Sequence, residues 1–194
     1  MVQSVAPSPI HEPQYQGLRL SADEYLSLQD DGFRYELIHG VVVISPRPVP
    51  RHQRVVGELF RLLSNHSTAH PVGESLMEFD IRFGPDLLYA PDIVFIAAGR
   101  TEPRPEKLTV VPDFVVEVLS PATRALDQQT KGNDYERCGV KEYWMVDPAT
   151  AGFRVLRLKD GKYTEFNHDG DRLESTAVPG FSIDLGAFKK RVLG

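Results

Sequence analysis

The sequence predicts a single domain of mixed α and β structure, of the α+β or α/β class, in which a mixed β-sheet is flanked by helices. Two apolar runs, residues 89–96 and 112–121, are rich in Val, Ile and Phe and bounded by proline, which is typical of strands buried on both faces. A long segment, residues 52–67, has apolar residues at helical spacing. With 194 residues, of which 41% are hydrophobic and 25% charged, the chain is long enough to bury a core.

Residues 1–16 differ from the rest of the chain. They include Pro7, Pro9 and Pro13, and we expect them to form a flexible N-terminal arm, with residues 17–194 forming the one domain. The arm lacks the basic start and apolar centre of a signal peptide, and no apolar stretch approaches the ~18 residues needed to cross a membrane. These observations predict a cytosolic protein with no membrane partner.

Charge and cysteine content exclude several classes of protein. The formal net charge is -5 and the pI is about 5.7, so binding to nucleic acid through a generally basic surface is not expected, although a local basic groove is compatible with these values. The single cysteine, Cys138, excludes an intramolecular disulfide framework and a cysteine-based zinc cluster.

Local signals place the elements that precede the apolar runs. Ser21-Ala22-Asp23-Glu24 has the pattern of a capping box and predicts a short helix that ends near Leu28. Residues 33–38 and 41–44 are predicted strands, joined by a tight turn at His39-Gly40. The helix predicted over 52–67 has its apolar positions at Val55, Val56, Leu59, Phe60, Leu62 and Leu63.

The middle and the end of the chain are predicted to supply most of the sheet. Residues 76–83 are predicted to form one strand, and a polar loop at 100–107 separates the two apolar strands. A helix over 124–137, closed by Gly139, is followed by a strand at 142–146. Two further predicted strands, at 153–158 and 162–166, form a hairpin across Asp160-Gly161, and residues 181–193 are predicted to end the chain in a short helix or strand.

Two carboxylates stand inside the apolar runs, at Asp92 and Glu117. A buried carboxylate without a partner costs several kcal/mol, so it needs a cation, a metal or a proton. Two oxygen ligands on neighbouring strands, completed by water and phosphate, are a common way to hold Mg²⁺. The alternative is that Asp92 caps a turn after Pro91 and that Glu117 faces solvent at a strand edge.

Two further residues are candidates for the same site. Lys131 lies on the helix after the Glu117 strand, where an ammonium could orient an attacking water or stabilise developing negative charge. Its alternative role is an exposed ion pair with Asp127, worth ~0.3–0.5 kcal/mol. Glu36 could add a third carboxylate to a metal site, or could be a solvated strand residue. 

The start of the long helix has a possible role of its own. His52 and Gln53 stand there beside Arg51 and Arg54, and a helix N-terminus with basic residues suits a phosphate. The alternative is an ordinary polar first turn.

Five strings in this order, "YELIHGVVVISP", "RHQRVVGELFRLL", "APDIVF", "PDFVVEVLSPAT" and "GVKEYWMVDP", resemble the Uma-two-type endonuclease family. That family belongs to the PD-(D/E)xK phosphodiesterase superfamily of restriction-endonuclease-like nucleases. The resemblance runs from about Leu18 to Leu185. It implies a restriction-endonuclease-like mixed β-sheet flanked by helices, a divalent metal and hydrolysis of phosphodiester bonds.

The resemblance also implies roles for individual residues. Asp92 matches the aspartate of the PD element, Glu117 the second acidic residue, and Glu36 an additional glutamate often found near such sites. The chain departs from the superfamily pattern at Leu119, two residues after Glu117, where a lysine is usual. Lys131 is the matching lysine, moved to the following helix, and the adjacent Gly132-Asn133 indicates that this helix is irregular.

Three functions follow from these observations. The leading one is a Mg²⁺- or Mn²⁺-dependent endonuclease that cleaves DNA, with Asp92, Glu117 and Glu36 as metal ligands and Lys131 as a catalytic cation. The second is a catalytically silent nuclease-like module that binds nucleic acid or protein, and the third is hydrolysis of another phosphoester. A homodimer is expected, because the hairpin at 153–166 could extend a sheet across a two-fold axis.

Overall fold

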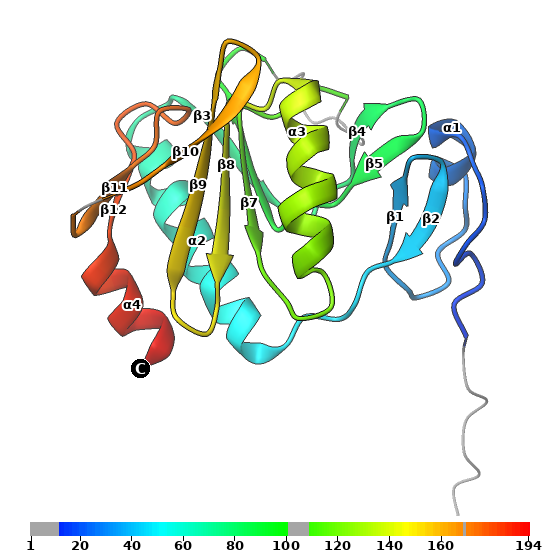
Figure 1. Ribbon diagram of the computed structural model, residues 1–194, viewed down its shortest axis with the longest axis horizontal. Helices are drawn as coiled ribbons and strands as arrows, with labels where there is room; N and C mark the ends of the chain where they lie inside the picture. The colour runs from blue at the N-terminus through cyan, green and yellow to red at the C-terminus, as the bar shows by residue number, and fades with distance from the viewer. Residues whose placement is uncertain (1–11, 101–108, 169) are drawn as a thin grey trace, which may run out of the picture.

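Two β-sheets form the frame of the molecule, and the computed structural model describes them within residues 12–100, 109–168 and 170–194. In this part of the chain the larger sheet has six strands, in the order β10-β9-β8-β7-β6-β3 (Figure 1). They are β3 (Gly73–Met77), β6 (Ile93–Ala97), β7 (Phe114–Val118), β8 (Glu142–Asp147), β9 (Gly152–Lys159) and β10 (Lys162–Phe166). Neighbouring strands are antiparallel except β7 and β8, which run parallel. The sheet is therefore mixed, as the sequence predicts.

The smaller sheet lies to one side of the larger one (Figure 1). Its four described strands follow the order β2-β1-β5-β4, and a separate pair joins β11 to β12. These strands are β1 (Tyr35–Ile38), β2 (Val41–Ile44), β4 (Ile81–Gly84), β5 (Leu87–Tyr89), β11 (Arg172–Glu174) and β12 (Ser182–Asp184). The pair formed by β11 and β12 was not predicted from the sequence.

Helices cover both faces of the larger sheet, with α2 on one face and α3 on the other (Figure 1). The described helices are α1 (Ala22–Leu26), α2 (Pro50–Ala69), the π-helix η1 (Leu126–Lys131), α3 (Gly132–Cys138) and α4 (Leu185–Leu193). Throughout the described ranges, none of them combines the length and the apolar composition that a membrane crossing requires.

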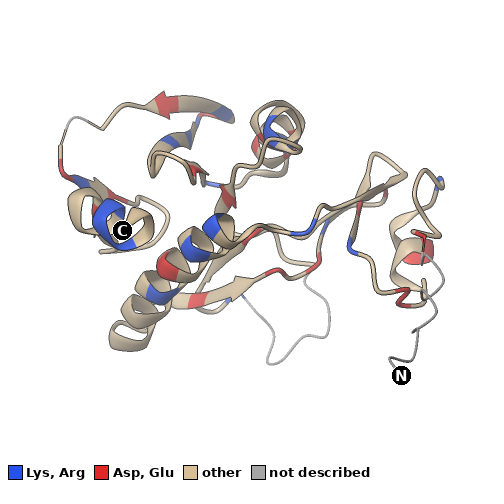
Figure 2. Cartoon of the chain, turned by 90° about the horizontal axis from the view of Figure 1, so that it is seen from below, with Lys and Arg blue, Asp and Glu red and all other residues tan. Residues whose placement is uncertain are grey.

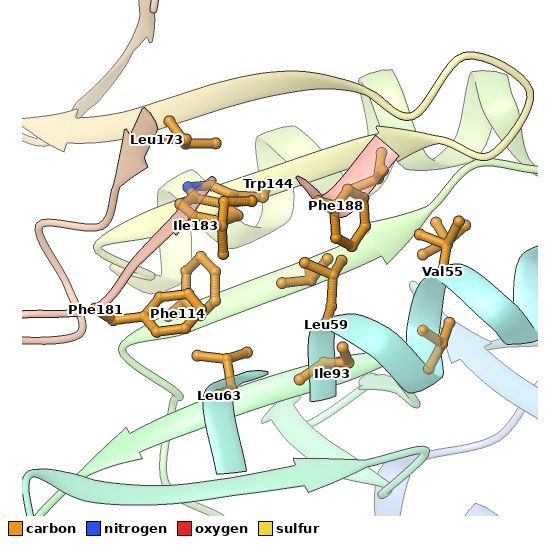
Figure 3. Close-up of a cluster of buried hydrophobic side chains, with 14 of the residues drawn as sticks. Val55, Leu59, Leu63, Ile93, Phe114, Trp144, Leu173, Phe181, Ile183 and Phe188 are labelled. Carbon is orange, nitrogen blue, oxygen red and sulfur yellow. The ribbon is translucent and has the colours of Figure 1, made fainter. Parts of the chain in front are cut away.

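Successive residues of the central strands contribute to two separate cores. On β7, Phe114 and Val116 pack in the core under α2, whereas Val115 packs in the core under α3. Figure 3 shows the first core, in which Leu59 of α2 points toward the sheet and toward Phe114. Burial on both faces explains why these strands are continuously apolar in sequence, because neither face can tolerate a solvated side chain.

Several local predictions are confirmed. The capping box of α1 is complete, with Ser21 and Glu24 each accepting the other's backbone N–H. The turn at His39-Gly40 has φ angles of 48° and 77°, and that at Asp160-Gly161 has 52° and 77°, as a type I′ hairpin turn requires. Gly139 ends α3 with a left-handed φ of 84°.

Two predicted strands are wrong, because each is divided between the two sheets. The segment 76–83 is interrupted at Glu78, which has a φ of 49°, and its halves belong to β3 and β4. The segment 89–96 is interrupted at Pro91, which has no backbone N–H to donate to a strand ladder. The chain leaves β5 there and enters β6, so Asp92 stands immediately before β6.

The predicted arm and the predicted loop fall partly outside the described residues. Residues 1–11 of the arm and 101–108 around the loop belong to the ranges that are not described. The last residues of the arm contact the domain: the ring of Tyr15 packs edge-on against Tyr35, with 5.7 Å between centroids, and Gln16 Oε1 accepts the N–H of Ile44.

A buried glutamate joins the C-terminal segment to the larger sheet. Glu142, at the start of β8, accepts hydrogen bonds from the indole N–H of Trp144, the hydroxyl of Ser175 and the N–H of Ala177, and its carboxylate pairs with Arg157. Because each carboxylate oxygen has partners, the charge can be buried without an unsatisfied group. The strands β11 and β12 and helix α4 are thereby held against β8 and β9.

A second buried carboxylate, Asp113, precedes β7. Its Oδ2 accepts the N–H of Ala97 and lies 2.6 Å from Arg100, and its Oδ1 lies 2.8 Å from Lys141. Burial acts to raise the pKa of Asp113, but the contacts with Lys141, Ala97 and Arg100 outweigh it and lower the pKa below its ordinary value. Ionised Asp113 therefore stabilises the fold.

The contribution of Asp113 should be visible in how the free energy of unfolding depends on pH. Because the pKa of Asp113 is lower in the folded state than in the unfolded state, its contribution is present above the unfolded pKa and is lost as the pH falls, between about pH 5 and about pH 2. Urea unfolding measured across this range should give a steeper loss of unfolding free energy for the wild type than for Asp113→Asn. Equal slopes for the two proteins would contradict the assignment.

Candidate active site

The ammonium of Lys131 is buried among three carboxylates. Its Nζ lies 2.9 Å from Glu36 Oε1, 2.9 Å from Glu117 Oε1 and 3.5 Å from Asp127 Oδ1. Lys131 is only 4% exposed, and Glu36, Glu117 and Asp127 are also buried. Since an isolated buried charge costs several kcal/mol, each of these groups depends on the others for its burial.

Three separate elements bring this cluster together. Glu36 comes from β1 of the smaller sheet, Glu117 from β7 of the larger sheet, and Lys131 is the last residue of η1. A π-helical segment is uncommon and is often found at functional sites. The irregular helix expected at Gly132-Asn133 is therefore confirmed, with the π-helix η1 directly preceding α3.

Two buried tyrosines surround the Lys131 ammonium. The hydroxyl of Tyr135 donates to Glu117 Oε1 at 2.9 Å, the same oxygen that faces Lys131. The ring of Tyr89 lies with its centroid 5.1 Å from Lys131 Nζ, within the range of a cation–π interaction. The hydroxyl of Tyr89 donates to Asp134 Oδ2 at 2.6 Å, and this hydrogen bond fixes the orientation of the ring.

Asp92 lies next to Glu117 across the β6–β7 pair, because the antiparallel register places Ile93 opposite Val116. Its Oδ2 accepts the backbone N–H of Val118 at 2.7 Å and lies 3.2 Å from His52 Nε2. Burial acts to lower the pKa of His52, but the hydrogen bond and the charge of Asp92 outweigh it and raise the pKa.

The lysine, the carboxylates around it, Asp92 and His52 line one cavity of about 330 Å³, and the two tyrosines lie outside its lining. The polar groups facing it include Glu36, Asp92, Glu117, Asp127, Lys131 and His52. Its rim consists of the segment that enters α2, with Arg47, and of the turn after β7, with Ser120 and Thr123, while Arg34 lines the side formed by the smaller sheet. The acidic groups therefore face a cavity that Arg34 and Arg47 also line.

The charges in the cavity are unbalanced. Burial raises the pKa of Glu117 to about 8, with further contributions from Asp127, Asp92 and Glu36, although Lys131 acts in the opposite direction. Burial also raises the pKa of Asp127. For Lys131, burial acts to lower the pKa, but Glu117, Glu36 and Asp127 raise it well above its ordinary value. Three carboxyl groups thus face one ammonium, and Glu117 and Asp127 take up a proton more readily than solvated carboxyl groups do.

The four residues singled out in the sequence meet at this cavity. Glu117 is 5% exposed, so it does not face solvent at a strand edge. The pair between Lys131 and Asp127 exists, but it is buried and shared with two glutamates. Glu36 is likewise buried rather than solvated. The N–H that Asp92 accepts belongs to Val118 at the end of β7, 26 residues away, so this contact holds the neighbouring strand and does not cap a turn after Pro91.

Sequence reasoning missed the contacts of His52 and Tyr135. His52 was weighed as a phosphate-binding or merely polar first-turn residue, whereas its ring is buried against Asp92. A signal was present: His52 precedes Val55, Val56 and Leu59 by three, four and seven residues, which places it on the buried face of α2.

The donor set was compared with what a divalent cation requires. Among the residues that the structure describes, no group of three or more His, Cys, Asp or Glu side chains is placed so that it could hold a metal ion. Asp92 and Glu117 nevertheless line the same cavity. Because Mg²⁺ takes few protein ligands and keeps several waters, two carboxylates fit its chemistry.

A solved structure has the same fold. It is described as the crystal structure at 1.96 Å of a putative nuclease belonging to DUF820 from Anabaena variabilis ATCC 29413. The TM-score is 0.76, and the match covers 89% of this chain and 99% of that chain at 20% sequence identity. No curated protein sequence matches this chain.

A family model described as Uma2, putative restriction endonuclease, matches residues 22–186. The match includes β1, β6, β7 and η1, the elements that supply the carboxylates and the lysine of the cavity. The chain therefore belongs to the Uma2 family of restriction-endonuclease-like nucleases.

Proposed function

We propose that this protein is a metal-dependent endonuclease that hydrolyses phosphodiester bonds, with DNA as its substrate and Mg²⁺ or Mn²⁺ as its cofactor. The observation that carries the proposal is the burial of Lys131 against Glu36 and Glu117 in a cavity that Asp92 also lines. Membership of the Uma2 family supports the same class of reaction.

Asp92 and Glu117 are the proposed metal ligands, and Glu36 is proposed to assist with its Oε2, since its Oε1 faces Lys131. When bound, a divalent cation would lower the pKa of a coordinated water and neutralise charge on the phosphodiester. Tyr135 would keep the carboxylate of Glu117 in place through the hydrogen bond to its Oε1.

Lys131 is proposed to act as a cation and not as a base. Its pKa is raised well above the ordinary value by Glu117, Glu36 and Asp127, so the side chain is protonated at neutral pH. A protonated amine at this position can orient the attacking water by donating a hydrogen bond. It can also stabilise the negative charge that develops on the phosphoryl oxygens in the transition state.

A catalytically silent nuclease-like module is the second candidate function. The net charge of -5 favours it, because nucleic acid is not attracted to the chain as a whole. The ion pairs of Lys131 with Glu36 and Glu117 also favour it, since these contacts would account for the buried charges without any turnover. Turnover on DNA separates the two functions.

Cleavage of supercoiled plasmid DNA tests the proposed activity. The wild-type protein should nick or linearise the plasmid with Mg²⁺ or Mn²⁺, and a chelator should abolish the reaction. Asp92→Ala and Glu117→Ala should each reduce the rate by more than about 100-fold, because each removes a ligand from a site with few protein donors.

Glu74→Ala is the matched control, since Glu74 is an exposed carboxylate on β3, away from the cavity. This variant should cleave at the wild-type rate. Absence of cleavage by the wild type with both metals, on duplex and single-stranded DNA, would favour the silent module.

Replacement of Lys131 should change how stability depends on pH. In Lys131→Met, Glu117 and Glu36 lose their cation, so the folded-state pKa of Glu117, already about 8, should rise further above its unfolded value. A raised folded-state pKa gives stability that is present at low pH and lost as the pH rises. Between about pH 5 and about pH 7 both proteins should lose unfolding free energy at a similar rate, whereas from about pH 8 to about pH 9 the loss should level off in the wild type and continue in Lys131→Met.

Urea unfolding at several pH values in this window measures the effect. The double variant Lys131→Met/Glu117→Gln removes the carboxylate as well, and its slope should return toward that of the wild type. Parallel slopes for Lys131→Met and the wild type would show that the cluster is not electrostatically coupled in solution.

We also propose that the enzyme is a homodimer, because nucleases that cut both strands commonly pair. The hairpin of β9 and β10 leaves β10, whose residues are mostly exposed, at one edge of the larger sheet. Light scattering at micromolar concentration should give twice the 21.8 kDa mass of the chain. A mass of one chain would refute the dimer.

A further inference from the structure

His52 occupies a buried position at the otherwise polar start of α2. It is 8% exposed, whereas its neighbours Arg51 and Gln53 are exposed. The three arginines of α2, Arg51, Arg54 and Arg61, are all exposed, and Figure 2 shows no lysine or arginine in the last turns of the helix. The imidazole therefore does not belong to this basic surface, and its surroundings lie inside the protein.

The imidazole and a strand N–H converge on one oxygen of Asp92. His52 Nε2 lies 3.2 Å from Oδ2, and the backbone N–H of Val118 donates to the same Oδ2 at 2.7 Å. One donor comes from α2 and the other from the end of β7, so the carboxylate is held from two directions. Both of these contacts with described residues are made by Oδ2. The other carboxylate oxygen, Oδ1, is therefore left to face the cavity that Asp92 lines.

The other ring nitrogen of His52, Nδ1, makes no hydrogen bond with the described residues that would replace its contact with water. This nitrogen is buried. A buried polar atom without a partner is unfavourable, because it has lost its hydrogen bonds to water. A residue needed only to fill the space between α2 and β7 would avoid this cost by being apolar. The gain from the histidine must therefore come from its other nitrogen, which faces Asp92.

We propose that His52 is a positioning residue that fixes the carboxylate of Asp92 so that Oδ1 is the oxygen presented to the divalent cation; this rests on the proposed function. The side chain of Asp92 is 13% exposed and follows Pro91 outside β6, so no strand ladder fixes it. Residues that hydrogen-bond to metal ligands commonly contribute 10–100-fold in metal affinity. This role is distinct from the phosphate-binding role considered for His52 from its sequence position.

The test measures Mn²⁺ binding to the full-length chain by calorimetry, without nucleic acid. His52→Gln keeps an amide N–H near the position of Nε2, whereas His52→Met has a similar length and no N–H donor. The Met variant should bind Mn²⁺ about 10–100-fold more weakly than the wild type, and the Gln variant should recover most of the affinity. His52→Asn has an amide that is too short to reach Oδ2 and should resemble the Met variant.

The melting temperature of each variant checks its fold. If the Met variant does not fold, the Mn²⁺ affinities of the Gln and Asn variants are compared instead. Both variants retain a side-chain amide, but only the glutamine is long enough for its amide to reach Asp92 Oδ2. Wild-type affinity in the Met or Asn variant would overturn the proposal, as would equal weakening in Gln, Met and Asn.

The same titrations separate this proposal from the proposed function. If the wild type binds Mn²⁺ and Asp92→Ala does not, the metal site stands, and the His52 variants alone decide the positioning role. If the wild type binds no Mn²⁺, the metal step of the proposed function fails, and the positioning role fails with it.

Discussion

The rest of the site depends on the ammonium of Lys131, which is paired with Glu36 and Glu117 at 2.9 Å on each side. These contacts join β1 of the smaller sheet, β7 of the larger sheet and η1 at a single buried point. Removing one partner from a buried ion pair typically costs 3–5 kcal/mol, because the remaining charge stays buried and unpaired. The relative placement of the two sheets and the geometry of the cavity are therefore coupled through one cation, and Glu36 strengthens this coupling by also accepting the N–H of Ala90.

Stability alone does not explain why these charged groups are buried together. Burial raises the pKa values of Glu117 and Asp127, so keeping these groups ionised in the folded protein costs free energy even with Lys131 beside them. Apolar residues of similar volume are often as stable as a buried ion pair, or more stable. The unpartnered Nδ1 of His52, a few ångströms from Asp92, adds to this cost. Unfavourable polar groups gathered around one cavity indicate that this part of the chain is adapted to bind charge.

The sequence alone predicted those features that leave a local signature. Asp92 and Glu117 were identified because a carboxylate inside an apolar run is unusual, and the hairpin turns because Asp160-Gly161 favours left-handed φ angles. It did not predict the division of strands between two sheets, because β5 and β6 are both continuously apolar and buried, so the pattern is the same on either side of Pro91. It offered the pair of Lys131 with Asp127, but not the direct contact of Lys131 with Glu36, 95 residues away along the chain, or that of His52 with Asp92.

The position of the lysine follows from which face of β7 the site uses. Val115 and Leu119 pack in the core on the α3 side, whereas Phe114, Val116 and Val118 pack on the α2 side, so Glu117 shares its face with Leu119. A lysine at 119, as the superfamily pattern has it, would project from this same face. In this chain an apolar residue fills that position, and the helix covering the face supplies the ammonium from Lys131, 2.9 Å from Glu117. Under the proposed function, Lys131 would take the role of that lysine from another backbone position, since electrostatic stabilisation depends on where the charge lies.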